Sequence, residues 1–153
     1  MSRLELKIPP VVLVILCAVA MALLSSFTAQ GWSTDAGTKR LALGMAAAGG
    51  LVAAAGVLQF RRAKTTVNPV SPASSSSLVT GGIYRFSRNP MYLGFLLVLA
   101  AWACYLGSAA AALIVPLFVL YMNRFQIEPE ERALARLFGQ EFDDYRARVR
   151  RWI

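Results

Sequence analysis

Residues Gly81–Gly94 read Gly-Gly-Ile-Tyr-Arg-Phe-Ser-Arg-Asn-Pro-Met-Tyr-Leu-Gly, and this basic, donor-rich stretch separates two long apolar runs. Adjacent glycines permit backbone conformations that other residues avoid. Pro90 suits the first turn of a helix, where a missing N–H group breaks no hydrogen bond. A helix N-terminus offers free N–H groups and partial positive charge to an anion. The stretch therefore predicts an anion-binding loop that leads into a membrane helix. A basic loop that only fixes membrane topology is an equally good interpretation of these residues alone.

The composition is typical of a membrane protein. Of the 153 residues, 57% are hydrophobic and 16% are charged, and no carboxylate occurs between Asp35 and Glu128. The net charge of +8 comes from basic residues that flank apolar runs, which favours membrane lipids over nucleic acid as the partner. The chain has no histidine, which excludes an imidazole base and a histidine-bound metal. We expect no metal site, and we expect Cys17 and Cys104 to pack in apolar segments without pairing.

The apolar segments predict a single domain, 1–153, that is an all-α integral membrane protein with about four transmembrane helices. Residues 1–60 contain the first two, from about Ile8 to Ala29 and from about Arg40 to Phe60. The first is long enough to span a bilayer and has no clear cleavage site, so we do not interpret it as a signal peptide. The second is rich in glycine and alanine, which predicts close packing on a neighbouring helix.

Residues 90–125 predict a transmembrane hairpin with arms of about Pro90–Leu106 and Ser108–Arg124. Pro116 is expected to kink the second arm. The preceding residues, 61–89, predict a long loop that includes a mobile run of serines at 74–77.

Residues 128–153 predict a C-terminal cytoplasmic amphipathic helix. Glu128-Pro129-Glu130-Glu131 has the carboxylates and proline of a helix start. The arginines near the chain end suit a helix C-terminus and anionic lipid, and Trp152 suits the membrane interface. Gly139 is a residue at which the helix can be interrupted. The apolar stripe that we expect to pack on the bundle consists of Leu134, Phe138, Phe142, Tyr145 and Val149.

The distribution of basic residues predicts the topology. With four spans, only Lys39 and Arg40 lie on one side, and the other basic residues lie on the opposite side. The positive-inside rule then places both termini, the 61–89 loop and the C-terminal segment in the cytoplasm. We expect the inner membrane of a prokaryote.

Two blocks of sequence resemble a known superfamily. Arg88-Asn89-Pro90-Met91-Tyr92-Leu93-Gly94 resembles the Arg-His/Asn-Pro-x-Tyr-x-Gly signature of the isoprenylcysteine carboxyl methyltransferases and phospholipid methyltransferases. Glu130-Glu131-x-x-Leu134, followed by Phe138-Gly139-x-Glu141-Phe142-x-x-Tyr145, resembles the C-terminal motif of that superfamily. The resemblance is to a short prokaryotic-type member and covers about Val79 to Ile153. The earlier residues match only as generic membrane helices.

The resemblance implies S-adenosyl-L-methionine as the methyl donor and one pocket formed by both blocks. The carboxylate of S-adenosyl-L-methionine needs cations or N–H donors, while the amino group and ribose hydroxyls of this molecule need acceptors. Glu130 and Arg124 are the catalytic residues that it implies. Arg124 would hold an acceptor carboxylate or phosphate, with a helix-end snorkelling residue as an equal alternative. The implied cofactor-binding residues are Tyr84, Arg85, Arg88, Asn89, Pro90, Tyr92, Gly94, Glu130 and Glu131.

The implied activity is methyl transfer to a lipophilic acceptor. An isoprenylcysteine-like carboxylate is the acceptor most resembled, and an amine headgroup or a small thiol are alternatives. Asn89 stands where the eukaryotic prenylcysteine enzymes usually have histidine, which leaves the acceptor open. Four spans can be too few to close the pocket, so a homodimer is an option. Alternatives are a nicotinamide-dependent reductase of the same superfamily, a non-catalytic scaffold, and a small transporter. A proton-coupled transporter would need an intramembrane carboxylate.

Overall fold

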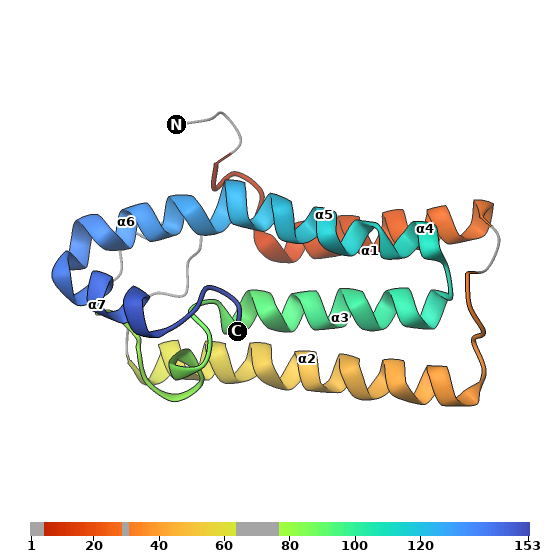
Figure 1. Cartoon of the computed structure of the whole chain (residues 1–153), viewed down its shortest axis with the longest axis horizontal. Helices are drawn as coiled ribbons and strands as arrows, with labels where there is room; N and C mark the ends of the chain where they lie inside the picture. Colours follow the sequence, from red (N-terminus) through yellow and green to blue (C-terminus); the bar gives the residue numbers. More distant parts are fainter. Residues whose placement is uncertain (1–4, 29–30, 64–76) are drawn as a thin grey trace.

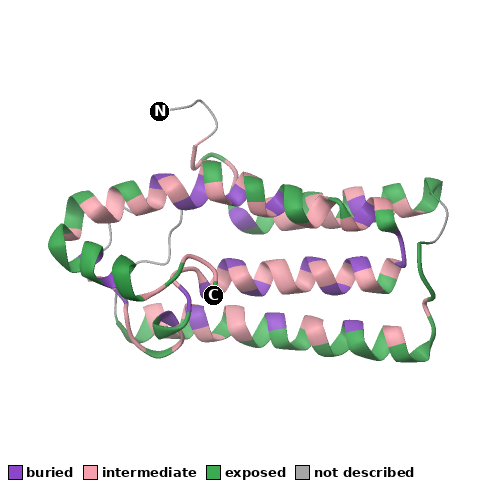
Figure 2. Cartoon of the chain, viewed as in Figure 1, coloured by how far each residue is buried: buried purple, intermediate pink, exposed green. Residues whose placement is uncertain are grey.

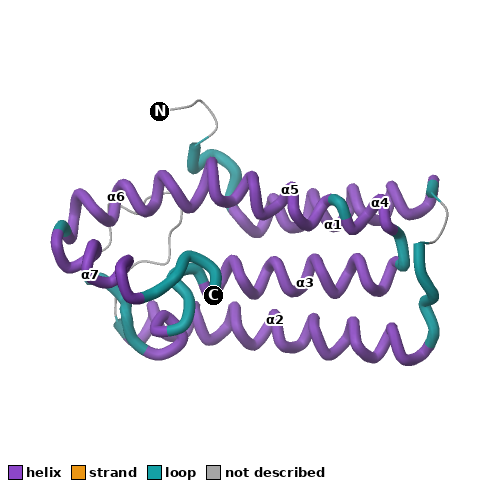
Figure 3. The backbone as a smooth tube through the Cα atoms, in the orientation of Figure 1, coloured by secondary structure: helices purple, strands orange, loops and turns teal. Residues whose placement is uncertain are grey.

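A computed structural model describes residues 5–28, 31–63 and 77–153, and these residues form helices joined by loops, without strands (Figure 3). The all-α prediction is therefore confirmed. The elements in chain order are α1 (Pro10–Phe27), α2 (Ala36–Arg62), the 3₁₀-helix η2 (Gly82–Arg85), α3 (Pro90–Leu106), α4 (Ala109–Ala112), α5 (Ile114–Tyr121), the π-helix η3 (Met122–Ile127), α6 (Glu128–Phe138) and α7 (Gln140–Arg148).

Helix α3 is the centre of the bundle. Figure 1 shows α2 along one side of α3, with α1 and the α4–α5 run along the other. The contact between α2 and α3 depends on small residues. A Cβ atom at Gly94 would lie 2.5 Å from the carbonyl oxygen of Gly49 and 2.7 Å from Cβ of Ala53. The close packing predicted for the second helix is confirmed, and its partner is α3.

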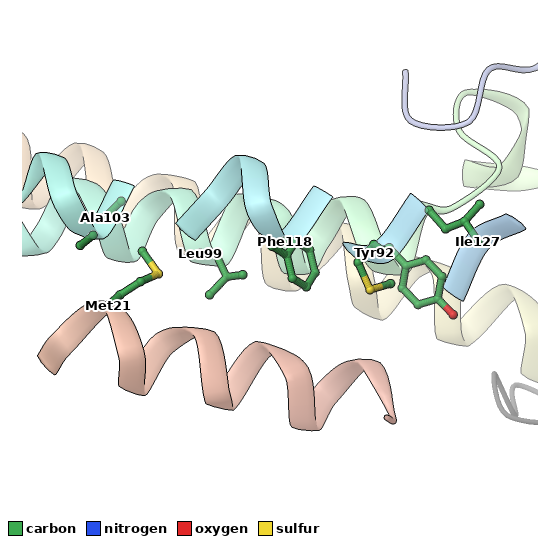
Figure 4. Packing of buried hydrophobic residues seen from close by; sticks show 8 residues of the cluster. Met21, Tyr92, Leu99, Ala103, Phe118 and Ile127 are labelled. Atoms are coloured by element: carbon green, nitrogen blue, oxygen red, sulfur yellow. The ribbon is translucent and has the colours of Figure 1, made fainter. Parts of the chain in front are cut away.

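The largest buried cluster lies between α3, α1 and α5. Figure 4 shows Met21 of α1, Leu99 of α3 and Phe118 of α5 pointing toward one another. Many large apolar side chains also lie on the outside of the bundle. Leu43 and Leu51 on α2, for example, are each 72% exposed. Figure 2 shows mostly exposed residues on the side of α2 away from α3. Apolar faces of this extent are expected where lipid covers them.

Three helical runs are long and apolar enough to cross a membrane: Pro10–Phe27, Ala36–Arg62 and Ala109–Phe138. Helix α3 is apolar but shorter. The chain therefore has the helices of an integral membrane protein, while a count of four spans stays a prediction. The run Ala109–Phe138 would be about 45 Å long as a helix, against a hydrocarbon core of about 30 Å. Its charged end therefore extends beyond the hydrocarbon.

The bounds of the first two helices differ slightly from the prediction. Helix α1 begins at Pro10 and ends at Phe27, and Ala29 lies outside the described residues. Helix α2 begins at Ala36, earlier than the predicted Arg40, because Asp35 caps it by accepting a hydrogen bond from the Thr38 N–H group (2.7 Å). This hydrogen bond lowers the pKa of Asp35.

The predicted C-terminal helix is present as α6 and α7, but its predicted start at Glu128 lies inside a continuous helical run. Ile127 and Glu128 have helical backbone angles, so the fourth apolar run continues through η3 into α6. The helix instead breaks at Gly139, which has φ of 50°, and α7 ends at Arg148. Within the fourth run, the interruption lies at Leu113, between α4 and α5, where Pro116 leaves the carbonyl group one turn earlier without an N–H partner.

The predicted 61–89 loop is partly described. Arg61 and Arg62 belong to α2, and η2 lies near the loop's end. Residues 64–76, including most of the serine run, lie outside the described residues. The C-terminal apolar stripe packs as predicted, on a second cluster that includes Phe60 of α2, Val79 and Tyr84.

Candidate active site

Arg88 joins the loop before α3 to the C-terminal part of the chain. Its Nη1 donates to the carbonyl oxygens of Val149 (2.7 Å) and Arg146 (3.1 Å). Its Nη2 donates to Oε1 of Glu131 at 2.7 Å. The side chain is only 10% exposed, so these contacts replace most of its hydration. Three hydrogen bonds therefore fix the guanidinium group at the end of α7.

Glu131 connects α6 to both the loop and the chain end. Besides Arg88, it accepts from Nη2 of Arg151 at 2.7 Å and from Nε of Arg151 at 3.2 Å. Each carboxylate oxygen of Glu131 thus faces a guanidinium group. The hydrogen bond to this carboxylate raises the pKa of Arg151. Such two-pronged pairing fixes geometry as well as charge.

The chain end returns to the start of α3. The Asn89 side-chain amide donates to the carbonyl oxygen of Arg151 (3.0 Å), and the Arg88 N–H group donates to that of Arg150 (3.0 Å). Trp152 Nε1 donates to Oδ1 of Asn123 in η3 (3.0 Å). Asn89 precedes Pro90, the first residue of α3, but does not cap the helix with its side chain. Its amide instead holds the chain end against the loop.

A second group of polar side chains surrounds Glu130, the residue before Glu131 at the start of α6. The Tyr92 hydroxyl donates to Oε1 of Glu130 at 2.6 Å, and the Gln126 side-chain amide donates to the same oxygen. Tyr92 and Gln126 are buried, and Glu130 is partly buried. Figure 4 shows the Tyr92 ring in the apolar core, with Ile127 close to it. The carboxylate is therefore held at the border between a dry core and the polar end of the bundle.

Tyr84 carries a buried hydroxyl group without a partner among the described residues. Its ring meets that of Phe60 edge-on, with centroids 5.3 Å apart. Its carbonyl oxygen accepts from the Tyr145 hydroxyl at 2.7 Å. Burial raises the pKa of Tyr84, and it raises the pKa of Tyr145 to about 12. An unpaired buried hydroxyl is costly, so Tyr84 is a position where a ligand group would gain a hydrogen bond.

Other predicted residues lie away from these groups. Arg85 is exposed and has no ion pair with a described residue. Arg124 has a side chain that is 55% exposed and pairs with Glu128 (3.2 Å) and Glu5 (3.8 Å). Gly94 faces α2 and serves the approach of the two helices. The structure therefore brings together Tyr84, Arg88, Asn89, Pro90, Tyr92, Glu130 and Glu131 around the start of α3. It leaves Arg85 and Arg124 at the edge, and it places Gly94 inside the contact between α2 and α3.

Sequence reasoning missed several members of the group. Arg151 was expected to contact lipid, and nothing local in the sequence pairs it with Glu131. Gln126 was also missed, although it is a polar residue one helical turn before Glu130 and so shares its face. The π-helix at Met122–Ile127 is a further signal, because such segments frequently occur at functional sites.

The apolar helices with a polar, carboxylate-containing cluster at one end define an integral membrane protein with a candidate ligand site outside the hydrocarbon. The chain belongs to the phospholipid methyltransferase family, whose profile matches residues 38–141. This confirms the superfamily read from the two sequence blocks. It also extends the resemblance back to α2, which had matched only as a generic membrane helix.

Individual relatives agree with the family. The chain is 48% identical over 63 residues to an uncharacterised protein of Haemophilus influenzae, which is covered over 100% of its length and aligns with 41% of this chain. It is 33% identical over 72 residues (47% of this chain) to the protein-S-isoprenylcysteine O-methyltransferase of Schizosaccharomyces pombe. It is 39% identical over 67 residues (44% of this chain) to methanethiol S-methyltransferase 1 of Bradyrhizobium diazoefficiens.

The two named methyltransferases are much longer than the matched part. The alignments cover 30% of the Schizosaccharomyces pombe protein and 22% of the Bradyrhizobium diazoefficiens protein. No solved structure matches the chain.

Proposed function

We propose that this chain is an integral-membrane methyltransferase that uses S-adenosyl-L-methionine to methylate a lipophilic acceptor. The observation that carries the proposal is the meeting of the two sequence blocks. Tyr92 bonds Glu130 at 2.6 Å and Arg88 bonds Glu131 at 2.7 Å, so residues 38 and 43 positions apart share one site. Family membership and the names of the relatives support methyl transfer. A cytoplasmic site in a prokaryotic inner membrane is part of the proposal.

The residues present fit the donor in their chemistry. The molecule would supply an electrophilic methyl group on a sulfonium sulfur. Glu130 can accept from an amino group or a ribose hydroxyl through the carboxylate oxygen that Tyr92 and Gln126 leave open. Tyr84 offers a buried hydroxyl without a described partner and an aromatic face. Asn89 and Pro90 bring the first turn of α3 to the same place.

Glu131 and Arg88 are assigned a positioning role in this proposal. Their mutual bond and the Arg151 pair use both oxygens of Glu131 and the Nη2 group of Arg88. A ligand would have to displace these contacts to bind there. We therefore assign direct cofactor contact to Tyr84, Tyr92 and Glu130. Arg85 and Arg124 remain candidates for the donor carboxylate and an acceptor anion, because both are exposed at the edge.

The proposed chemistry needs alignment and exclusion of water more than a strong base. Methyl transfer is a displacement that depends on holding donor and acceptor in line in a dry site. The apolar core around Tyr92 supplies the dry side, with Phe118, Met122 and Ile127 each at most 1% exposed. Glu130 lies where this core meets the polar residues. A prenylated carboxylate is the favoured acceptor, with a thiol or an amine headgroup as alternatives, and a homodimer stays a prediction.

The test is calorimetry on the protein in lipid nanodiscs with S-adenosylmethionine, its demethylated product S-adenosylhomocysteine, and NADPH. We expect the first two to bind and NADPH not to bind. Glu130→Gln should weaken binding of the donor by about 1–3 kcal/mol, the cost of a lost charged hydrogen-bond partner. Glu141→Gln is the control, because Glu141 is exposed and makes no described ion pair. Binding of NADPH alone would indicate a reductase, and binding of none would leave a scaffold.

A further inference from the structure

A second, unassigned feature lies at the opposite end of the bundle. An open groove of about 530 Å³ runs between α1 and α2, with α3 as its floor. Figure 1 shows why it exists, since α1 and α2 flank α3 on different sides. Both pack on α3 but barely on each other within the described residues. Val14, Ala46 and Trp102 are among the residues that line it.

The mouth of the groove is cationic, although its interior is apolar. Lys39 and Arg40, at the start of α2, line it together with Tyr105 near the end of α3. Lys39 Nζ lies 6.0 Å from the centroid of the Tyr105 ring, and that ring stacks on Trp102 at 5.4 Å. Neither cation pairs with a carboxylate among the described residues. The nearest carboxylate in sequence, Asp35, is used as a helix cap.

One wall of the groove is fixed by a tertiary contact. Trp102 Nε1 donates to the carbonyl oxygen of Ala18 in α1 at 3.1 Å. The indole therefore spans from α3 to α1, and Tyr105 and Lys39 extend the same wall to the mouth. The interior of the groove is apolar, and Lys39 and Arg40 place two positive charges at one end.

We propose that this groove binds an anionic phospholipid, with an acyl chain between α1 and α2 and the phosphate at Lys39 and Arg40. The apolar lining suits the chain, and the two cations suit the headgroup. A second copy in the same membrane orientation is a poorer occupant, because it would bring its own Lys39 and Arg40 to the same side of the membrane and so add positive charge near the mouth. The proposal does not depend on methyl transfer. Pro90 starts α3 at the candidate active site, and Tyr105 lies about 22 Å further along the helix.

The first test uses the fluorescence of Trp102 in the full chain. Trp32→Phe and Trp152→Phe leave Trp102 as the single tryptophan. Phosphatidylglycerol and phosphatidylcholine with identical brominated chains are then titrated into nanodiscs. We expect phosphatidylglycerol to reach half-maximal quenching at a mole fraction about tenfold lower than phosphatidylcholine, because two cations lie near the headgroup. Lys39→Gln with Arg40→Gln should remove this preference, while Arg61→Gln with Arg62→Gln at the other end of α2 should keep it.

The second test keeps all three tryptophans and blocks the groove. Ala46→Phe places a ring in the lining, and the adjacent Ala47→Phe places the same ring on an exposed position outside it. Native mass spectrometry with added phosphatidylglycerol should show the lipid adduct on the wild type and Ala47→Phe, and several-fold less on Ala46→Phe.

The proposal would be overturned by equal quenching by the two lipids, by an anionic preference that survives the double Gln variant, or by equal adducts on both Phe variants. Quenching by neither lipid, together with a doubled protein mass in light scattering, would overturn it in favour of a second copy. The calorimetry with S-adenosylmethionine is independent of all these outcomes.

Discussion

Glu131 links three segments that are distant in sequence. Its two carboxylate oxygens face Arg88 from the loop and Arg151 from the chain end. Removing the charge would leave Arg88, which is 10% exposed, beside carbonyl groups without a counter-charge. We expect Glu131→Gln to lower the free energy of unfolding by about 3 kcal/mol, the lower end for breaking a buried pair, because Arg151 is 31% exposed. Chemical unfolding in micelles measures this.

The control for this prediction is Glu141→Gln, on an exposed part of α7, which should change stability by no more than about 0.5 kcal/mol. The Glu131 variant should also become sensitive to trypsin at Arg150 and Arg151, since these residues lose their anchor. Equal stability of the two variants would mean that the ion pairs contribute little.

Tyr92 supplies the hydroxyl group that holds Glu130. Tyr92→Phe keeps the ring in the core but removes a donor from a partly buried carboxylate, so we expect a loss of about 1–3 kcal/mol of stability. Tyr105→Phe is the matched control. Tyr105 is 47% exposed, and its hydroxyl makes no hydrogen bond with a described residue. Thermal unfolding in detergent should separate the two variants, and similar melting shifts would contradict the role of Tyr92.

At the level of elements, the contact between α2 and α3 is the most extensive in the bundle. A Cβ atom at Gly94 would lie 2.5 Å from Gly49 O and 2.8 Å from Ala53 N, and backbone atoms cannot give way as a side chain can. Gly94→Ala should therefore push the helices apart and cost about 1–3 kcal/mol. Gly50→Ala has open space around its Cβ and should be neutral or stabilise α2 by up to about 1 kcal/mol. Melting temperatures that move together would show that this contact is not tight.

Helix α7 is held to the loop by a bond that depends on pH. Burial raises the pKa of Tyr145 to about 12, above an ordinary value of about 10. The folded state thus favours the protonated phenol, which donates to Tyr84 O. This stability is complete below pH of about 10 and is lost as pH rises through about 12, by about 3 kcal/mol at most. Tyr145→Phe should lose less stability than the wild type over this range, while phenolate absorbance reports the titration. Parallel pH profiles would contradict this role.

The elements with local signals could be predicted from the sequence. The bounds of α3 agree with the prediction because Pro90 starts the helix and Gly107 ends it with φ of 65°. The C-terminal elements could not be predicted as well. Continuity through η3 depends on packing, and a glutamate-rich turn imitates a helix start even inside a longer helix.

For the candidate site, the sequence predicted which residues lie together better than it predicted which residue each one contacts. The two blocks identified Arg88, Asn89, Glu130 and Glu131 as neighbours, and the structure brings them together. The partner of Glu131 could not be read from the sequence. Arg151 reaches Glu131 only because the helix breaks at Gly139 and the chain reverses direction. No local pattern in the sequence predicts this reversal.

The whole molecule has its charges arranged for one orientation in the membrane. Lys39 and Arg40 start α2 at the end of the bundle that carries the turn at Gly107, whereas the candidate active site and the arginines of α6 and α7 lie at the other end. Figure 1 agrees with this, since the C-terminus lies at the start of α3. If α1, α2, α3 and the α4–α5 run all cross the membrane, the positive-inside rule places the site in the cytoplasm.

Single cysteines test this orientation. In a Cys17→Ala, Cys104→Ala background, we introduce Ser33→Cys before α2 or Glu141→Cys in α7, both at exposed positions without a described side-chain partner. A membrane-impermeant maleimide added to intact cells should label the first and spare the second, because the positive-inside rule predicts that the turn end faces outward and the arginine-rich end faces inward. Inverted vesicles should give the reverse, and detergent should expose both. Labelling of both cysteines from the same side would mean that α3, the shorter apolar helix, does not cross, and the predicted count of four spans would be wrong.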